Sequence, residues 1–374
     1  VPNNNLRRLI GQWCAENDYE LDTAAAQQGD SATRSMVDNL PSTKAAMEAT
    51  RLTAKFLVEK ARHAVGAGES SVRIRRQAAY EIRLMAKEGT DNRLCIAEAG
   101  AVPALTELLL LRGSDHDAKT EEHAVTALLN LSINNERNKG IIMATEGALE
   151  MIAKVLVDGS SPEARQNAAA ALFSLTSAKE YRIRVGGKEG VIEGLLEILR
   201  TGDGRSRQDA ASTLFHIAFH DEYAAQMRQK GAVSTAIQAI LDEGARAGSP
   251  DGEEEVTAAA DIVALLAVLA RKAGGELPLV SAGVCQITDE LAELLATGSK
   301  RAQDHAVSLL FSACNLRDVQ ARTGTPMLDL VHKLRRLGSL VTALRRLLVV
   351  GTPHAQRKAA ALLRLFQWTS QTQE

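Results

Sequence analysis

Residues 165–176 read RQNAAAALFSLT, a stretch in which small residues and leucines recur at the spacing of one helix face. Variants of it occur at 77–86 (QAAYEIRLMA), 121–132 (EEHAVTALLNLS), 207–218 (RQDAASTLFHIA), 302–314 (AQDHAVSLLFSAC) and, more weakly, 358–367 (KAAALLRLFQ). A single helix of this kind exposes residues such as Leu128 and Leu131, which it cannot bury alone. The recurrence therefore predicts a solenoid, in which neighbouring units stack and share one core.

A second apolar helix, opened by a glycine, follows several of these stretches after a polar turn and a short helix. The six glycines lie about 40 to 55 residues apart, which is close to the period of armadillo and HEAT repeats; they are Gly100, Gly147, Gly190, Gly231, Gly283 and Gly338. The two longest intervals contain segments 242–258 and 321–336, whose composition predicts inserted loops. We expect a positive φ at each glycine. Asn92 and Asn138 are expected to cap the short helices.

The composition favours close-packed helices and excludes several function classes. Apolar residues make up 45% of the 374 residues, but aromatic residues only 3%, so alanine and leucine supply the core. A net charge of −2 and a pI near 6.5 provide no general attraction to nucleic acid. The four cysteines lack a CxxC pair, which is typical of reduced thiols and predicts a cytoplasmic or nuclear protein.

From about 72 to 367 the pattern resembles the armadillo repeat. The resemblance implies an all-α, right-handed superhelical solenoid of about six to seven repeats, with an isolated helix before it. Residues 42–71 form the N-terminal capping region and 72–374 the repeats. In the helix that opens the array we expect Ser42 as the cap, with Leu52 and Phe56 beginning the core.

The opening stretch VPNNNLRRLIGQWCAEN (1–17) places Leu6, Leu9, Ile10 and Trp13 on one helix face. One interpretation is an amphipathic helix that folds back on the repeats. The stretch also resembles the C-terminal end of a U-box, and Val1, where a start methionine would stand, suggests that the rest precedes it. With a polar linker at 18–41 and the repeats after it, the chain resembles the plant U-box/armadillo ubiquitin-protein ligases.

That resemblance implies a function for the parent protein. A U-box docks a ubiquitin-conjugating enzyme, and the repeats select the substrate; Pro2 and Asn3 match the end of the docking surface. The fragment alone is expected to be inactive, and the resemblance implies no catalytic residue, cofactor or metal within it. The alternative is a non-enzymatic armadillo scaffold or adaptor, in which the likeness of the first helix is accidental.

In armadillo proteins the third helix of each repeat lines a groove for protein partners. The corresponding positions here, at i, i+4 and i+8 spacing, are Glu122, Thr126, Asn130, Gln166, Ser174, Gln208, Ser212, His216, Ser308, Ser312 and Arg364. They are expected to be exposed and to contact a partner; the alternative is that they are merely solvated. Importins use a tryptophan and asparagine ladder there, whereas this chain has no tryptophan between 14 and 367.

Two further patterns point to ligands. His216 and His220 have the i, i+4 spacing of a zinc pair, but nearby cysteines and an HExxH glutamate are missing, so an accidental surface pair is the preferred interpretation. Between Leu330 and Gln373 there is no acidic residue, while several lysines and arginines occur. This asymmetry predicts either a solvated face or contact with an anionic surface, such as acidic lipid headgroups or a phosphorylated protein.

Overall fold

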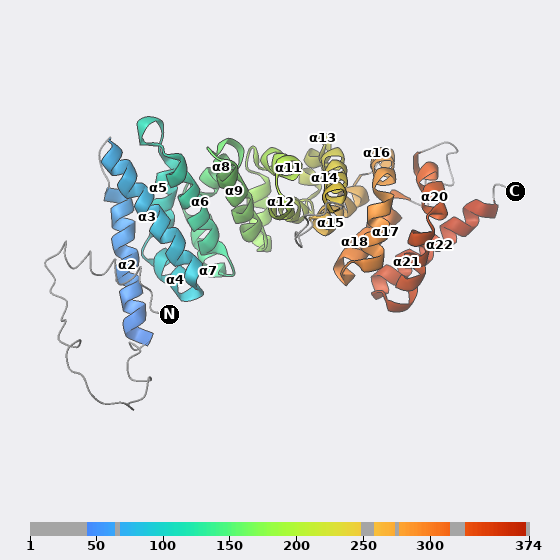
Figure 1. The fold of residues 1–374 in the computed structure, drawn as a ribbon, viewed down its shortest axis with the longest axis horizontal. Coiled ribbons are helices and arrows are strands. Elements are labelled where there is room, and N and C mark those ends of the chain that lie inside the picture. Colours follow the sequence, from blue (N-terminus) through green and yellow to red (C-terminus); the bar gives the residue numbers. More distant parts are fainter. Residues whose placement is uncertain (1–42, 64–67, 248–257, 274–276, 315–325, 372–374) are drawn as a thin grey trace, which may run out of the picture. The chain divides into compact units, whose positions relative to one another are not determined.

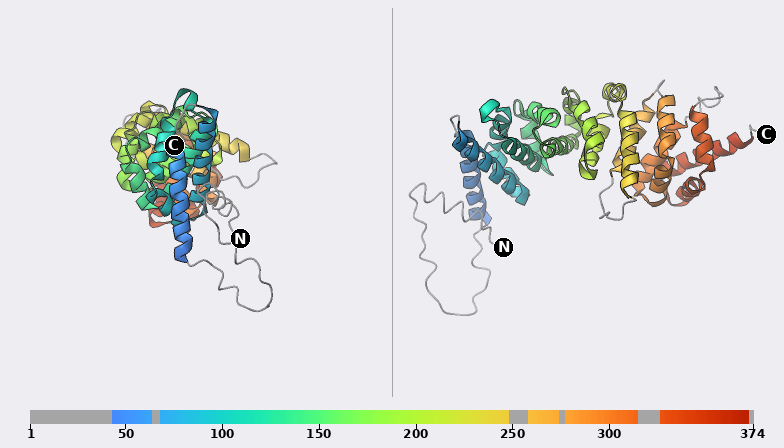
Figure 2. Two further views of the ribbon diagram at one scale, coloured as in Figure 1. Left: turned by 90° about the vertical axis from the view of Figure 1, so that its left-hand side faces the viewer. Right: turned by 45° about the horizontal axis from the view of Figure 1, so that its top comes forward.

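The computed structural model describes residues 43–63, 68–247, 258–273, 277–314 and 326–371, and within them every regular element is a helix. The chain divides into two compact units, residues 1–148 and 149–374. Inside each unit, successive helices pack side by side in chain order (Figures 1 and 2). Among the described residues, none of the helices combines the length and hydropathy needed to cross a bilayer.

The helices repeat in threes, which confirms the predicted period. The third helices are α3 (Glu69–Glu88), α6 (Ala118–Ser132), α9 (Pro162–Thr176), α12 (Gly204–Ile217), α15 (Ala259–Arg271), α18 (Lys300–Ala313) and α22 (Pro353–Gln371). The second helices are α2 (Thr43–His63), α5 (Ala101–Leu110), α8 (Ala148–Asp158), α11 (Val191–Thr201), α14 (Ala232–Ala247), α17 (Thr288–Thr297) and α21 (Gly338–Val350). The short first helices are α4 (Thr90–Glu98), α7 (Glu136–Ala144), α10 (Arg182–Gly186), α13 (Asp221–Gln229), α16 (Leu277–Val284) and α20 (Pro326–Arg336). In the part of the chain that the structure describes, 3-10 turns occur at Gly113–Asp115, Lys179–Tyr181 and Cys285–Ile287.

Six complete sets of three helices thus follow α2 and α3 within the described residues, in line with the expected six to seven repeats. Three segments differ from the sequence prediction. Residues 242–247 belong to α14, although 242–258 was expected to be an inserted loop. Residues 326–336 form α20, although 321–336 was expected to be an inserted loop. Helix α15 is a third helix that the repeated pattern did not reveal.

Oxygen-bearing side chains start most of the third helices, and each satisfies a free backbone N–H. Asp117 accepts from Thr120 N at 2.8 Å before α6, and Ser161 accepts from Ala164 N at 3.1 Å before α9. Asp203, Ser299 and Thr352 do the same before α12, α18 and α22. These residues mark where each third helix begins.

The core consists of alanine and leucine, as the composition predicted. Leu128, Leu131 and Leu172 are fully buried, with alanines packed between them. At the N-terminal end the prediction is partly wrong, because Leu52 is 59% exposed. The core of α2 is formed instead by Ala54, Leu57, Val58 and Ala61. Ser42 lies outside the described residues.

The glycines that precede second helices fall into two groups. Gly100, Gly147, Gly190 and Gly231 have φ between 77° and 87°, so the expected left-handed conformation is confirmed there. Gly283 lies within α16 and Gly338 is the first residue of α21, and neither has a positive φ. For these two glycines the expectation is wrong, because Gly283 is part of the first helix α16 and Gly338 already belongs to the second helix α21.

Asn138 has a different role from the predicted cap. The capping residue of α7 is Asn135, whose side chain accepts from Asn138 N at 3.0 Å. The Asn138 side chain is buried and donates to the carbonyls of Arg93 and Leu131, each at 3.0 Å. Asn92 donates to the Met85 carbonyl at 3.3 Å, and no side-chain cap bonds to the start of α4. Asn138 therefore joins one repeat to the preceding one.

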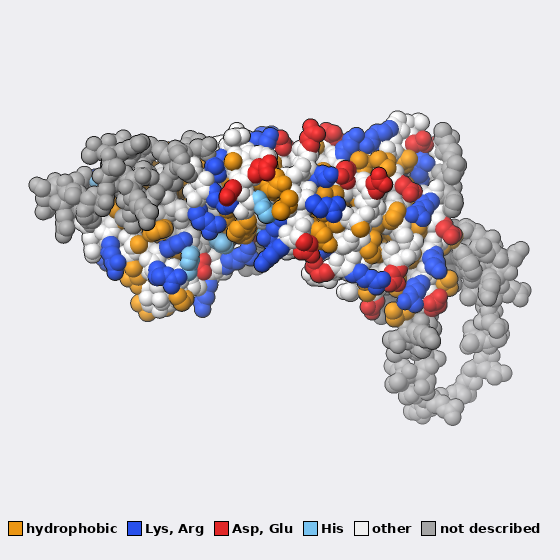
Figure 3. Space-filling view, turned by 180° about the vertical axis from the view of Figure 1, so that it is seen from behind, with side chains coloured by type: hydrophobic (Ala, Val, Ile, Leu, Met, Phe, Trp, Pro, Cys, Tyr) orange, Lys and Arg blue, Asp and Glu red, His pale blue; other side chains and the backbone are white. Residues whose placement is uncertain are grey.

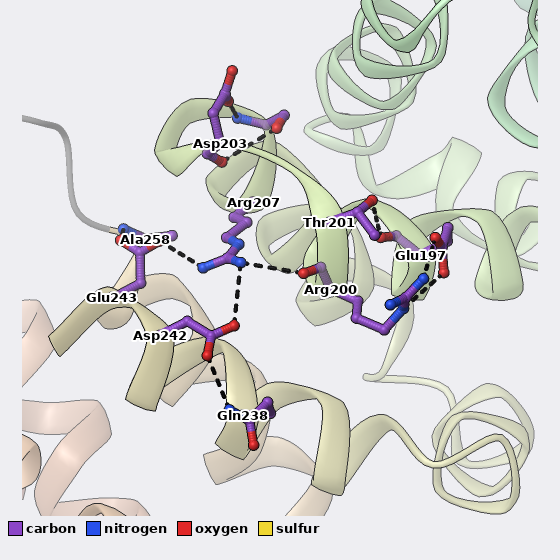
Figure 4. A network of polar contacts seen from close by, with 10 residues as sticks. Glu197, Arg200, Thr201, Asp203, Arg207, Gln238, Asp242, Glu243 and Ala258 are labelled. Atoms are coloured by element: carbon purple, nitrogen blue, oxygen red, sulfur yellow. Dashed lines mark hydrogen bonds and ion pairs between the residues drawn. The ribbon is translucent and has the colours of Figure 1, made fainter. Parts of the chain in front are cut away.

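A buried arginine ties α12 to the helices around it (Figure 4). Arg207 is 2% exposed, and its guanidinium donates to Glu243 at 3.0 Å and to the Arg200 carbonyl at 3.2 Å. Glu243, near the end of α14, also accepts from the backbone N–H of Ala258 at 3.4 Å. These contacts hold the end of α14 and the start of α15 against α11 and α12.

Candidate functional site

The predicted groove residues all lie on third helices, but they do not form one exposed surface. Glu122 and Thr126 on α6 and Ser212 on α12 are buried, which corrects the expectation that they face solvent. Asn130, Gln166, Ser174, Gln208, His216, Ser308 and Ser312 are half-buried, and Arg364 is exposed. Pro2 and Asn3 lie outside the described residues.

In the first unit, the polar residues of α6 serve packing between helices. The Glu122 carboxylate lies 2.8 Å from Lys119 Nζ and 3.8 Å from Arg83 Nη1 of α3. Asn130 Nδ2 donates to the Arg83 carbonyl at 3.1 Å. Glu122 is buried because cations from its own helix and from α3 cover it. These two residues join α3 to α6.

On α12 the predicted residues are also engaged within the chain. Gln208 and Ser212 donate to the two carboxylate oxygens of Asp261 on α15, at 3.1 and 2.9 Å. His216 stacks on Phe173 of α9, with ring centroids 5.8 Å apart, and its Nδ1 lies 3.1 Å from Thr176 Oγ1. Burial, followed by the charges of Arg182 and Arg301, lowers the pKa of His216 to about 4.

The two histidines of the possible zinc pair do not share a helix. Helix α12 ends at Ile217, whereas His220 precedes the first residue of α13. In the part of the chain that the structure describes, no three His, Cys, Asp or Glu side chains come together as a metal site. The accidental interpretation of the pair is therefore preferred on geometry.

The second unit contains a pocket of about 430 Å³ between the later third helices. Phe215 of α12 and Phe219, in the turn after α12, line one side, and Ala267 and Val268 of α15 lie between α12 and α18. The Phe215 ring meets the His305 ring of α18 edge to face, with centroids 5.5 Å apart. Because α15 presents small side chains here, residues of α12 and α18 approach each other across it.

The rest of the pocket is polar and predominantly basic. Its charged lining residues are Arg271, Arg301 and Lys358 against the single carboxylate of Asp304. The Asp304 carboxylate accepts from Thr352 Oγ1 at 2.5 Å. Figure 3 shows histidine side chains among Lys and Arg side chains on the half of the molecule that carries the later repeats. The pocket therefore has an aromatic side and an electropositive side.

Two predicted residues, Ser308 and Ser312, line this pocket. Lys358 Nζ of α22 donates to Ser308 Oγ at 2.7 Å and lies 5.7 Å from the centroid of the Phe311 ring. Burial, followed by the charge of Arg271, lowers the pKa of Lys358. The lysine is thus held in a site where its charge lacks full solvation.

Both pocket histidines are poor bases. Burial, followed by the charge of Arg301, lowers the pKa of His305. Burial and then Lys358 lower the pKa of His354, whose Nε2 lies 3.3 Å from Ser308 Oγ. Both shifts favour neutral imidazoles, so the positive charge of the pocket comes from its arginines and lysine.

Sequence reasoning missed the basic residues of the pocket. Arg271 belongs to α15, the helix that the pattern did not reveal, and Arg301 lies near the start of α18, about two turns before Ser308. Lys358 was part of the basic C-terminal segment, but nothing in the sequence places it beside Ser308. The signal that could have drawn attention to this site is an arginine at the end of α15 and another at the start of α18.

Comparisons with known proteins agree with the repeat architecture. The family described as the plant U-box protein ARM repeat region matches residues 57–373. U-box domain-containing protein 17 of Arabidopsis thaliana is 35% identical, and U-box domain-containing protein 4 of Oryza sativa subsp. japonica is 34% identical, each over 367 residues. Both matches cover 98% of this chain and 45% of the relative.

A third relative, A. thaliana U-box domain-containing protein 16, is 30% identical over 371 residues, which is 99% of this chain and 48% of the relative. The chain spans about half the length of the curated relatives that it matches.

Solved structures show the same fold. The crystal structure of computationally designed armadillo repeat proteins for modular peptide recognition matches with a TM-score of 0.53 at 20% identity, over 69% of this chain and 99% of the designed one. An engineered protein matches with a TM-score of 0.53 at 24% identity, over 70% and 98%. The stacked three-helix units are therefore armadillo repeats, as predicted.

Proposed function

This chain belongs to the plant U-box proteins with an armadillo-repeat region, and we propose that it is the partner-binding part of a ubiquitin-protein ligase. In the whole protein, a U-box would dock a ubiquitin-loaded conjugating enzyme while the repeats hold the substrate. The ligase then accelerates transfer by proximity and orientation, without a nucleophile of its own. The family match over residues 57–373 carries this proposal.

The opening residues support the assignment to a ligase. The match to the A. thaliana relative takes in 99% of this chain, so it extends into residues 1–17, which resemble the end of a U-box. We propose that Pro2 and Asn3 belong to the surface that contacts the conjugating enzyme. A scaffold without ubiquitin chemistry remains the competing function.

The later third helices are the proposed partner surface. They carry half-buried polar side chains and the pocket between α12, α15, α18 and α22. A pocket of about 430 Å³ is large enough to take one or two side chains of a bound protein. The designed armadillo proteins with the same fold were made for peptide recognition, which supports a protein ligand here.

The test uses the full-length parent protein with activating enzyme, a panel of conjugating enzymes and ubiquitin. A photoreactive amino acid at Ser312 would first identify the proteins that bind at the pocket in plant extract. These proteins should then be ubiquitinated by the parent protein. Substituting Pro2→Ala and Asn3→Ala together should reduce their ubiquitination while their capture is unchanged.

Two outcomes would contradict the proposal. If the crosslinked partners stay unmodified with every conjugating enzyme, although the parent protein is folded, the scaffold function is favoured. If ubiquitinated proteins never crosslink to the repeats, the substrate is held elsewhere.

A further inference from the structure

The pocket of the second unit contains cations that lack a carboxylate partner. Within the described residues, Arg271 and Arg301 make no ion pair, and Lys358 is held by the hydroxyl of Ser308. The one acidic residue of the lining, Asp304, is engaged by Thr352. Three positive charges thus face one cavity with a single carboxylate to offset them.

Several cations elsewhere in the second unit pair with a carboxylate. Lys188 lies against Glu150 of α8, Lys230 against Glu193 of α11, and Lys272 against Asp221 of α13. Arg207, the buried arginine of α12, binds Glu243. Against this pattern, gathering three cations without such partners costs free energy through mutual repulsion. An incoming anion would remove that cost.

The other side of the pocket is aromatic. Phe219 is 44% exposed, and Phe215 of α12 packs against it edge to face with centroids 5.1 Å apart. Exposed phenylalanine beside a cavity is a surface that gains free energy when an apolar group covers it. The pocket thus offers contacts of two chemical kinds at once.

We propose that this pocket binds an acidic segment of the partner protein. A carboxylate or phosphate group of the segment binds among Arg271, Arg301 and Lys358, and an adjacent apolar side chain packs on Phe215 and Phe219. Arginine suits this role because its planar guanidinium donates two parallel hydrogen bonds to an oxyanion. This inference rests on the proposed function, because it names the chemical class of the partner at the same surface.

The experiment measures fluorescence anisotropy of labelled short peptides on the complete 374-residue chain. The first peptide alternates glutamate with leucine; in matched peptides, glutamine replaces glutamate, phosphoserine replaces one glutamate, or glycine replaces leucine. The glutamate and phosphoserine peptides should bind, and the glutamine peptide should bind at least about tenfold more weakly. Comparing the first two distinguishes a carboxylate from a phosphate ligand. Binding should weaken as the salt concentration rises.

Substitutions locate the binding site. Arg271→Gln with Arg301→Gln should weaken binding of the glutamate peptide about tenfold or more, since two charge-assisted contacts are lost. The matched control is Arg345→Gln with Arg357→Gln, which removes the same charge from exposed arginines outside the pocket and should leave affinity within about twofold. Phe219→Ala should weaken the leucine peptide but not the glycine peptide. Circular dichroism would check that each variant is folded.

Several results would overturn the inference. Equal binding of glutamate and glutamine peptides would exclude charge recognition, and an equal loss in the control variant would exclude the pocket. Failure of all peptides to bind would exclude an acidic segment as the ligand. Vesicles containing phosphatidylserine that bind through Arg271 and Arg301, where peptides do not, would assign the site to a membrane. If partners crosslinked at Ser312 are still ubiquitinated in the Arg271→Gln/Arg301→Gln variant, the proposed function stands and only this inference fails.

Discussion

The guanidinium of Arg207 on α12 lies 3.0 Å from the carboxylate of Glu243 on α14, and the two side chains are 2% and 10% exposed. A charge pair this far from water is held by its mutual attraction and by the further bonds from the Arg200 carbonyl and the Ala258 N–H. The pair connects α12 to α14, and Glu243 also accepts from the Ala258 N–H on the far side of segment 248–257, so the second unit depends on these contacts.

Substituting Arg207 should therefore lower the stability of the folded chain. In Arg207→Met the buried carboxylate of Glu243 loses its cation, and the free energy of unfolding should fall by about 3–5 kcal/mol. Urea denaturation followed by circular dichroism measures the change. Arg207→Met combined with Glu243→Met should recover part of the loss, because no uncompensated charge remains.

Arg200→Met is the matched control, since that arginine pairs with Glu197 at the surface. The urea midpoint should then be nearly unchanged. A loss as large as that of Arg207→Met would mean that the stem of the side chain, and not its buried charge, stabilises the helices.

Two glycines that look alike in sequence should respond in opposite directions to alanine. Gly190 has φ +78°, and an added Cβ would lie 2.9 Å from Val157 Cγ2, so Gly190→Ala should cost about 1–2 kcal/mol. Gly338 begins α21 with no atom within 4 Å of an added Cβ. Gly338→Ala should stabilise the chain by up to about 1 kcal/mol. Thermal unfolding of both variants tests this; equal shifts would disprove the difference in backbone conformation.

The buried leucines of the third helices should be sensitive to truncation. Leu172 is fully buried on α9, so Leu172→Ala should cost about 2–5 kcal/mol through lost burial and a cavity. Val349 on α21 is 80% exposed, and Val349→Ala should change stability by less than about 0.5 kcal/mol. Denaturant titrations of the two variants give the comparison. A larger loss at Val349 would mean that the third helices are not the core of the stack.

His216 should make the free energy of unfolding fall at acid pH. Because its pKa is lowered to about 4 in the folded chain, folding favours the neutral ring, and the resulting stability is present above the unfolded pKa of about 6.5. That stability is lost as the pH falls from about 6.5 to about 4. After allowance for partial exposure, the loss is on the order of 1–2 kcal/mol. His216→Gln should lose less stability over the same range.

Comparing His216→Gln with the wild-type chain separates the contribution of His216 to the pH dependence of stability from the opposing contribution of Asp209. Burial raises the pKa of Asp209 to about 6, so its contribution is present at low pH and lost as the pH rises through about 6. Asp209 is unchanged in His216→Gln, and its effect cancels in the difference. Parallel pH profiles for the two proteins would show that His216 does not titrate as described.

Most of the fold could be predicted from the sequence, because the repeated small-residue and leucine pattern follows directly from helices that share a core. Helix α15 escaped because Ile262 to Ala270 are buried on every side, so polar residues do not alternate with apolar ones. The wrong prediction that Leu52 begins the core has a similar origin. Periodicity identifies an apolar stripe, but the neighbouring helices decide which part of the stripe they cover.

The site was less predictable. Ser308 and Ser312 lie on α18 and line the pocket, whereas Glu122 and Ser212 are buried because Arg83 and Asp261, from neighbouring helices, bind them. The pocket combines residues of α12, α15, α18 and α22, whose distances depend on how the repeats stack. Spacing within one helix contains no information about those distances.

The small side chain of Ala267 has a consequence for how such proteins diverge. A leucine at this position would occupy part of the space between Phe215 and Phe219 on one side and the basic lining residues on the other, with the buried leucines of the core unchanged. On the proposed function, two descendants of one gene could then acquire different targets through a single codon, while both retain the same scaffold. Substitutions at position 267 would therefore let protein engineers change binding at the pocket separately from folding.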